Sequence, residues 1–286
     1  MEVAGGLCTR TRGPLQTCAL DAAMPFDYES RATSKIKESK QLTIGIVGFG
    51  TFGQFLAKRL VQHGHKVLAT SRTNYQHEAA GLGVSFFRDP DDFCEEHPDV
   101  VILACAILAL EKVIGSLPLQ RLRRSTLIVD VLSVKQFPKQ LLLSMLPPEM
   151  DVLCTHPMFG PDSGKGSWGG LNLMYDKVRI GSAGRRQARV DSFLQFFAEQ
   201  GCRMVEMSCE EHDRLAAGTQ FITHSVGRVL GEMGLESTSI DTKGFEALLR
   251  LVDNTNNDSF DLYYGLFMYN QNATEELARL EAAFDS

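Results

Sequence analysis

The sequence lacks the cysteine patterns of disulfide-stapled and zinc-binding proteins. It has seven cysteines, an odd number, and no pair has the C-x-x-C or related spacing of a zinc site. It also has no apolar run of the ~18 residues that a membrane-spanning helix requires. These absences predict free thiols in a reducing compartment, no metal site, and a soluble chain that is not inserted in a membrane.

Positive charge is also scarce. The chain of 286 residues has 29 Lys and Arg against 35 Asp and Glu, a formal net charge of -6 at pH 7. This balance argues against nucleic acid or an anionic membrane surface as a partner. The length allows two domains, and the composition, 44% hydrophobic and 22% charged, is that of an ordinary enzyme. Local positive groups must therefore meet any anionic substrate.

Residues 1–40 show no periodic pattern. The first twenty residues contain Arg10 and Arg12 with Glu2 as the only acid, which is typical of the end of an organelle transit peptide. We expect a disordered extension or a transit-peptide remnant, with a scar from an expression vector as the alternative.

Strand and helix patterns alternate over residues 41–208. One strand is expected at the start of the stretch 43–56. Further strands are expected at 65–70, 84–87, 100–106, 126–131, 151–156, 177–180 and 202–207, with helical patterns between most of them. This alternation predicts an α/β domain with a Rossmann-like, doubly wound parallel sheet.

Strand patterns stop after residue 207, and the remaining periodicity is helical. Helices are expected at 210–234, 242–254 and 258–284. We therefore predict a smaller all-α domain over residues 209–286, which buries its apolar faces against the first domain and against a second copy in a homodimer.

A glycine-rich turn joins the first strand to the first helix. Gly48, Gly50 and Gly53 have the G-x-G-x-x-G spacing of dinucleotide-binding turns, between an apolar strand and a helical pattern. The helix would begin at Thr51 and Phe52, where unpaired backbone N–H groups favour a pyrophosphate. The alternative is a turn that binds nothing, but the strand and helix around it favour a dinucleotide.

The next strand ends at Ser71, Arg72 and Thr73. An NAD site usually has an acidic residue at this point to bind the ribose 2′-hydroxyl, whereas an arginine accommodates the 2′-phosphate of NADP. Arg72 has no acidic neighbour, so NADP is the predicted cofactor. The alternative is that Arg72 is a solvated charge at the end of a strand.

Polar residues also follow two later strands, where ligands of an open parallel sheet bind. His156 begins a loop fixed by two prolines and a glycine, and it is a candidate general base; alternatively, its own loop satisfies it. Ser133 would donate to the substrate or orient His156, or else it is a helix N-cap.

The helix at 210–224 has a polar face among Ala and Gly residues. We expect Gln220 and His224 to contact the substrate, because they lie in mid-helix among apolar residues. His212 and Asp213 have the simpler interpretation of a solvated first turn. Arg228, one turn beyond His224, would pair either with a substrate carboxylate or with an acidic side chain.

Several of these stretches together resemble one family. The matching stretches are Gly48–Gly53, Asp130–Lys135, Thr155–Lys165, Glu211–Asp213 with Gln220–His224, and Tyr264–Asn270. They resemble the plant TyrA-type arogenate/prephenate dehydrogenases, and the resemblance extends from Asp21 to the end of the chain.

The resemblance implies NADP-dependent oxidative decarboxylation of a cyclohexadienyl substrate in tyrosine biosynthesis, in a plastid or, alternatively, in the cytoplasm. The ring C4 hydroxyl would give its proton to His156, hydride would leave C4, and loss of the C1 carboxylate would aromatise the ring. Ser133 and Gln220 would be substrate-site groups.

Substrate choice would depend on Asp258. An acid before a Ser-Phe pair marks arogenate preference in plant relatives, and Asp258 stands there, where its carboxylate would attract the arogenate ammonium and disfavour prephenate. The alternative is that Asp258 is the N-cap of the last helix.

Two other functions are compatible with a Rossmann-like domain followed by a helical domain. A β-hydroxyacid or imine reductase would use a catalytic lysine in the helical domain, where Lys243 is the only lysine. A non-catalytic NADP-binding protein would be expected to have lost Ser133 or His156, and both are present.

Overall fold

The structure, a computed structural model, describes residues 41–256 and 258–286. Residues 42–286 form one compact unit. The predicted N-terminal extension lies outside the described residues. Among the described helices, none combines the length and the apolar composition needed to cross a membrane.

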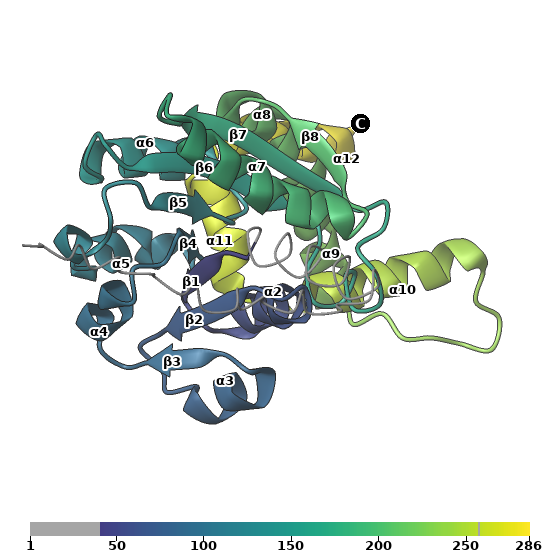
Figure 1. The fold of residues 1–286 in the computed structure, drawn as a ribbon. Coiled ribbons are helices and arrows are strands. Elements are labelled where there is room, and N and C mark those ends of the chain that lie inside the picture. The colour runs from purple at the N-terminus through teal and green to yellow at the C-terminus, as the bar shows by residue number, and fades with distance from the viewer. Residues whose placement is uncertain (1–40, 257) are drawn as a thin grey trace, which may run out of the picture. The chain divides into compact units, whose positions relative to one another are not determined.

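One sheet organises residues 43–206 (Figure 1). Its eight strands lie in the order β3-β2-β1-β4-β5-β6-β7-β8. They are β1 Thr43–Val47, β2 Lys66–Thr70, β3 Ser85–Phe87, β4 Val100–Leu103, β5 Leu127–Asp130, β6 Asp151–Pro157, β7 Asn172–Arg179 and β8 Arg203–Glu206.

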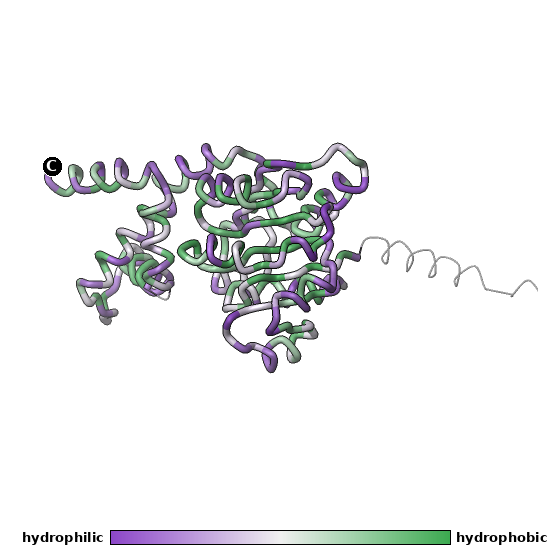
Figure 2. Tube along the Cα trace, turned by 90° about the vertical axis from the view of Figure 1, so that its left-hand side faces the viewer, coloured by the Kyte–Doolittle hydropathy of each residue, from purple (hydrophilic) through white to green (hydrophobic). Residues whose placement is uncertain are grey.

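Helices cover both faces of this sheet, because residues of the central strands alternate between two cores. In β4, Val100 and Ile102 pack in one core, with α2, α3 and α7, whereas Val101 and Leu103 pack in the other, with α4, α5 and α6. These helices are α2 Thr51–Gln62, α3 Gln76–Leu82, α4 Pro90–Glu95, α5 Leu110–Ser116, α6 Gln136–Met145 and α7 Gly184–Glu199. Figure 2 shows the strands as mainly hydrophobic segments at the centre of the sheet. The predicted doubly wound fold is therefore confirmed.

The direction of β7 differs from an all-parallel sheet. Strands β1 to β6 pair in parallel, but β7 runs antiparallel to β6, and β8 then pairs in parallel with β7. No helix lies between β6 and β7, and the loop at 158–171 returns the chain beside β6 without the crossover helix that usually joins parallel strands.

All described elements after β8 are helical. They are α8 Cys209–Ala216, a π-helical turn at Ala217–Phe221, α9 Ile222–Glu232, α10 Lys243–Asn256, α11 Phe260–Met268 and α12 Ala273–Asp285. The single helix expected at 258–284 is wrong, because the chain breaks between α11 and α12. There the Asn270 side chain accepts a hydrogen bond from the backbone N–H of Asn272 at 3.0 Å, which favours a turn over a continuing helix.

Candidate active site

The turn between β1 and α2 requires two of its three glycines for packing. Gly48 has a φ of 96°, and a Cβ atom there would lie 2.6 Å from the carbonyl oxygen of Ala104. A Cβ atom on Gly53 would overlap the carbonyl oxygen of Gly48. Both positions therefore exclude any side chain.

Gly50 has a different role, because a Cβ atom there would meet nothing within 4 Å. It is the N-cap residue of α2, and no side chain caps this helix end. The first N–H groups of the helix, at Thr51 and Phe52, have no intrahelical acceptors. Open space beside uncapped donors at a helix N-terminus fits the phosphates of a dinucleotide.

Arg72 lies at the same edge of the sheet. Its strand, β2, ends at Thr70, whose carbonyl oxygen accepts a hydrogen bond from Gly48 N–H at 2.9 Å. The Arg72 side chain is exposed beside half-buried Ser71 and exposed Thr73, and it makes no hydrogen bond or ion pair with the described residues. Both its expected role at a 2′-phosphate and the solvated alternative remain consistent with this placement.

His156 is buried near the end of β6, with 4% of its surface exposed. Its Nδ1 atom lies 2.8 Å from Nε2 of His212, on α8. The alternative that its own loop satisfies His156 is therefore wrong. Burial lowers the pKa of His156 well below 6.5, and the nearby side chains of His212 and Lys135 lower it further.

His212 and Asp213 are buried as well, so the prediction of a solvated first turn is wrong. Only 3% and 1% of their surfaces are exposed. The carboxylate of Asp213 accepts hydrogen bonds at 2.8 Å from the backbone N–H groups of Lys135 and Gln136, at the start of α6. Helix α8 therefore packs against the N-terminus of α6, and this contact buries His212 and Asp213 while Glu210 and Glu211 stay exposed.

Ser133 is not a helix N-cap. The N-cap residue of α6 is Lys135, and the acceptors at this helix end come from Asp213. The Ser133 side chain is half-buried and has no hydrogen-bond partner among the described residues. The ammonium of Lys135 is fully buried, where it donates to Asp130 and, at 2.6 Å, to the carbonyl oxygen of Thr155, the residue before His156.

Gln220 and His224 lie on the π-helical turn and on α9. Oε1 of Gln220 and Nδ1 of His224 are buried, and neither has a hydrogen-bond partner among the described residues. On the other side of its ring, Nε2 of His224 lies 3.8 Å from Oδ2 of Asp258. Unsatisfied buried polar atoms are uncommon in folded proteins and often mark a ligand site.

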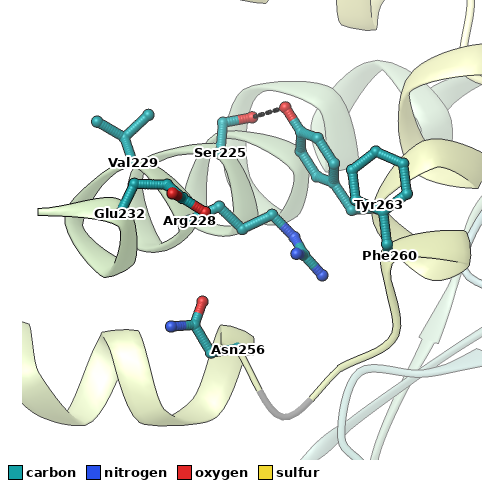
Figure 3. A pocket seen from close by; sticks show the side chains of 7 residues that line it. All are labelled: Ser225, Arg228, Val229, Glu232, Asn256, Phe260 and Tyr263. Atoms are coloured by element: carbon teal, nitrogen blue, oxygen red, sulfur yellow. Dashed lines mark hydrogen bonds between the residues drawn. The ribbon is translucent and has the colours of Figure 1, made fainter. Parts of the chain in front are cut away.

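A pocket of about 270 Å³ lies between α9, the end of α10 and the start of α11, and Figure 3 shows the side chains that line it: Ser225, Arg228, Val229, Glu232, Asn256, Phe260 and Tyr263. The Arg228 guanidinium lies 5.6 Å from the ring of Phe260 and 5.3 Å from that of Tyr263. It donates to the backbone oxygen of Asp258 at 2.9 Å, and its Nε atom has no partner among the described residues. It forms no ion pair with a described carboxylate, so the alternative of an internal salt bridge is wrong.

Asp258 is not an N-cap. Helix α11 is capped by Ser259, whose hydroxyl accepts a hydrogen bond from Leu262 N–H at 3.2 Å. Burial raises the pKa of Asp258 above its usual value, and Asp162 adds to this effect, whereas His224 and Arg228 oppose it. The Asp258 carboxylate accepts no hydrogen bond from the described residues, and its nearest basic partner is His224, at 3.8 Å.

The predicted residues thus form two groups, and sequence reasoning missed part of the first. Ser133 and His156 lie at the ends of neighbouring strands, together with His212 and Asp213. His224, Arg228 and Asp258 form the second group. No cluster of three or more His, Cys, Asp or Glu side chains among the described residues has the arrangement of a metal site.

Comparisons with known proteins show what the chain is similar to in sequence and in fold. Residues 43–134 match the family model described as NADP oxidoreductase coenzyme F420-dependent, and residues 229–286 match that described as TYRAAT1-like, C-terminal domain. A solved structure, prephenate dehydrogenase from Aquifex aeolicus with hydroxyphenyl propionate and NAD+, has a TM-score of 0.67 at 18% identity, over 86% of this chain and 88% of that one. This likeness shows that the two share a fold.

Two curated relatives from Arabidopsis thaliana are much closer in sequence. The chain is 58% identical to arogenate dehydrogenase 2, chloroplastic, over 95% of this chain and 76% of that protein. It is 60% identical to arogenate dehydrogenase 1, chloroplastic, over 93% of this chain but only 42% of the relative. The chain belongs to the plant TyrA-type arogenate/prephenate dehydrogenase family.

Proposed function

We propose that the chain catalyses NADP-dependent oxidative decarboxylation of arogenate to tyrosine, in tyrosine biosynthesis in the plastid. The observation that carries this proposal is His156, a buried histidine at the carboxyl edge of the sheet whose lowered pKa keeps it neutral near pH 7. The names of the two Arabidopsis relatives, both chloroplastic arogenate dehydrogenases, support the substrate and the compartment.

The cofactor would lie on the turn at Gly48–Gly53. Its pyrophosphate would bind the N–H groups at Thr51 and Phe52, and the guanidinium of Arg72 would bind the 2′-phosphate of NADP. When bound, the nicotinamide supplies the hydride acceptor for ring C4 of the substrate. The exposed Arg72, with no acidic neighbour, is what supports NADP over NAD.

His156 would act as the general base. A neutral imidazole accepts the proton of the C4 hydroxyl as hydride leaves C4, and the hydroxyl oxygen becomes a carbonyl. The bond from C1 to its carboxylate then breaks, CO2 leaves, and its electron pair makes the ring aromatic as a phenolate. His156 returns the proton to this phenolate, so protons and electrons balance.

The remaining substrate contacts would come from groups that lack partners in the structure. Ser133 has a free hydroxyl near the end of β5, and Gln220 has a buried, unsatisfied oxygen, so both would orient the ring hydroxyl and carboxylate. The amino-acid side chain would bind in the second group. There the carboxylate would pair with Arg228 and the ammonium with Asp258, whose Oδ2 lies 3.8 Å from Nε2 of His224.

We further propose the predicted division of the chain, with NADP binding by residues 41–208 and substrate binding and dimerisation by residues 209–286. Exposed apolar side chains on the helices after β8 support a homodimer, because an isolated chain would leave them in water. They are Val229, Met233, Leu248, Phe260, Tyr264 and Met268.

The test follows NADP reduction by absorbance, with arogenate and prephenate in parallel, on the purified chain, on His156→Asn and on the control His77→Asn. His77 is an exposed histidine on α3. We expect turnover of arogenate that is retained in the control and reduced at least about 100-fold in His156→Asn. Equal turnover of prephenate would refute the choice of substrate, and no turnover of either would refute the activity.

A further inference from the structure

Asp213 fixes the direction of a hydrogen-bond chain that leads to His156. Its Oδ1 accepts from Lys135 N–H and its Oδ2 from Gln136 N–H, each at 2.8 Å. Each oxygen of this carboxylate thus faces a backbone donor and acts as an acceptor. Nδ1 of His212 lies 2.9 Å from Oδ1, so this nitrogen carries a proton and donates it.

The same reasoning extends one residue further. A neutral His212 with its proton on Nδ1 has a lone pair on Nε2, which lies 2.8 Å from Nδ1 of His156. Nδ1 of His156 must then donate, because two lone pairs at that distance would repel each other. In the neutral ring the proton on Nδ1 leaves Nε2 unprotonated, so Nε2 is the atom that can accept a proton.

We propose that His212 and Asp213 are positioning residues that hold His156 in the tautomer with a free Nε2 and share the positive charge that forms when Nε2 is protonated. This inference rests on the proposed function, because it assigns a role in the proton transfer to His156. Neither residue touches the substrate in this scheme; both act through His156.

The surroundings of His156 make such sharing necessary. His156 is buried, and the buried ammonium of Lys135 lies close to it, so an imidazolium would be costly there. The negative charges that face this region are those of Asp213, reached through His212, and Asp130, which is paired with Lys135. When Nε2 of His156 accepts the proton, two hydrogen bonds become stronger: the one from Nδ1 of His156 to His212 and the one from His212 to Asp213. The positive charge is then shared between the two histidine rings and is opposed by the Asp213 carboxylate.

Asp213 is a poor residue for the test, because its carboxylate also caps α6 and a substitution would disturb that helix. His212 separates the two roles. Gln at this position has a carbonyl oxygen that can accept from Nδ1 of His156, whereas Leu fills the space but accepts nothing. A residue that merely fills space would tolerate Leu at least as well as Gln.

The first measurement is steady-state kinetics with arogenate and NADP on the full chain, His212→Gln and His212→Leu, with His77→Gln and His77→Leu as matched controls. We expect His212→Leu to lower kcat about 100-fold with KM changed less than about threefold, since a misplaced general base loses most of its typical contribution. His212→Gln should recover at least about tenfold of that loss. Equal kcat values in the two His212 variants would overturn the proposal.

The second measurement does not depend on activity or on either variant. Nitrogen-15 NMR of the histidine-labelled wild-type chain reports which ring nitrogen carries the proton, and His156→Asn identifies the His156 signals. We expect Nδ1–H for His156; Nε2–H would overturn the proposal even if both variants failed to fold. If the wild-type chain turns over neither arogenate nor prephenate, the proposed function fails, while the tautomer still decides whether the hydrogen-bond chain exists.

Discussion

Replacing Asp258 by Asn removes one charge from the second group and little else. The side chain is 44% exposed, and its Oδ2 lies 3.8 Å from Nε2 of His224. Arg228 holds the backbone oxygen of Asp258 and not its carboxylate, so the substitution leaves that contact in place. The change should therefore report on the charge at this position, and not on the packing around it.

The magnitude follows from Coulomb's law. Two unit charges about 4 Å apart interact by ~1 kcal/mol in water and ~4 kcal/mol at an effective dielectric constant of ~20. For a half-exposed carboxylate we take ~2 kcal/mol, which corresponds to a loss of about 30-fold in kcat/KM for arogenate. The kcat/KM for prephenate should rise, because its side chain carries a carboxylate but no ammonium and would no longer face Asp258.

The assay compares kcat/KM for arogenate and prephenate in the wild-type chain, Asp258→Asn and Asp261→Asn. Asp261 is an exposed acid in the first turn of α11, so its substitution makes the same chemical change nearby. We expect the ratio of kcat/KM for arogenate to kcat/KM for prephenate to fall only in Asp258→Asn. An unchanged ratio in that variant, or an equal fall in Asp261→Asn, would refute the local pairing with an ammonium.

Two further predictions concern the cofactor and the base. Arg72→Asp should lower kcat/KM for NADP by about 10- to 100-fold and favour NAD, since a hydrogen bond to a charged group contributes about 1.5–3 kcal/mol; equal loss with both cofactors would contradict a 2′-phosphate contact. The acid limb of kcat/KM for arogenate should lie below pH 6.5, because burial lowers the pKa of His156 and activity is lost only as pH falls through that lowered pKa. A limb at or above pH 6.5 in the pH profile would contradict this role.

The sheet and the glycine turn could be predicted from the sequence because their signals are local. Buried parallel strands have continuous apolar runs. In the glycine turn, neighbouring backbone leaves no room for a side chain at Gly48 and Gly53, and Gly50 leaves open space for a ligand. The antiparallel direction of β7 could not be predicted in the same way. It depends on how the chain returns after β6, and no residue of β7 records that path.

The burial of His212 and Asp213 was missed for a similar reason. Polar residues in the first turn of a helix are usually solvated, and their burial here depends on α6, which is distant in the sequence. One signal was available, since α6 begins at Lys135 and Gln136 without a side-chain cap of its own. A helix end without a local cap predicts an acceptor from elsewhere in the chain.

Asp213 links the orientation of the predicted base, His156, to the packing of α8 against α6. Its side chain holds the start of α6, its backbone oxygen accepts from Asn270 at 2.7 Å, and through His212 it reaches His156. A buried carboxylate is costly unless hydrogen bonds and charges compensate it, and these contacts supply that compensation only when α8 lies against α6. The orientation of the base therefore depends on the correct docking of the helix that follows β8, which makes folding of that region a condition for proton transfer and not only for substrate binding.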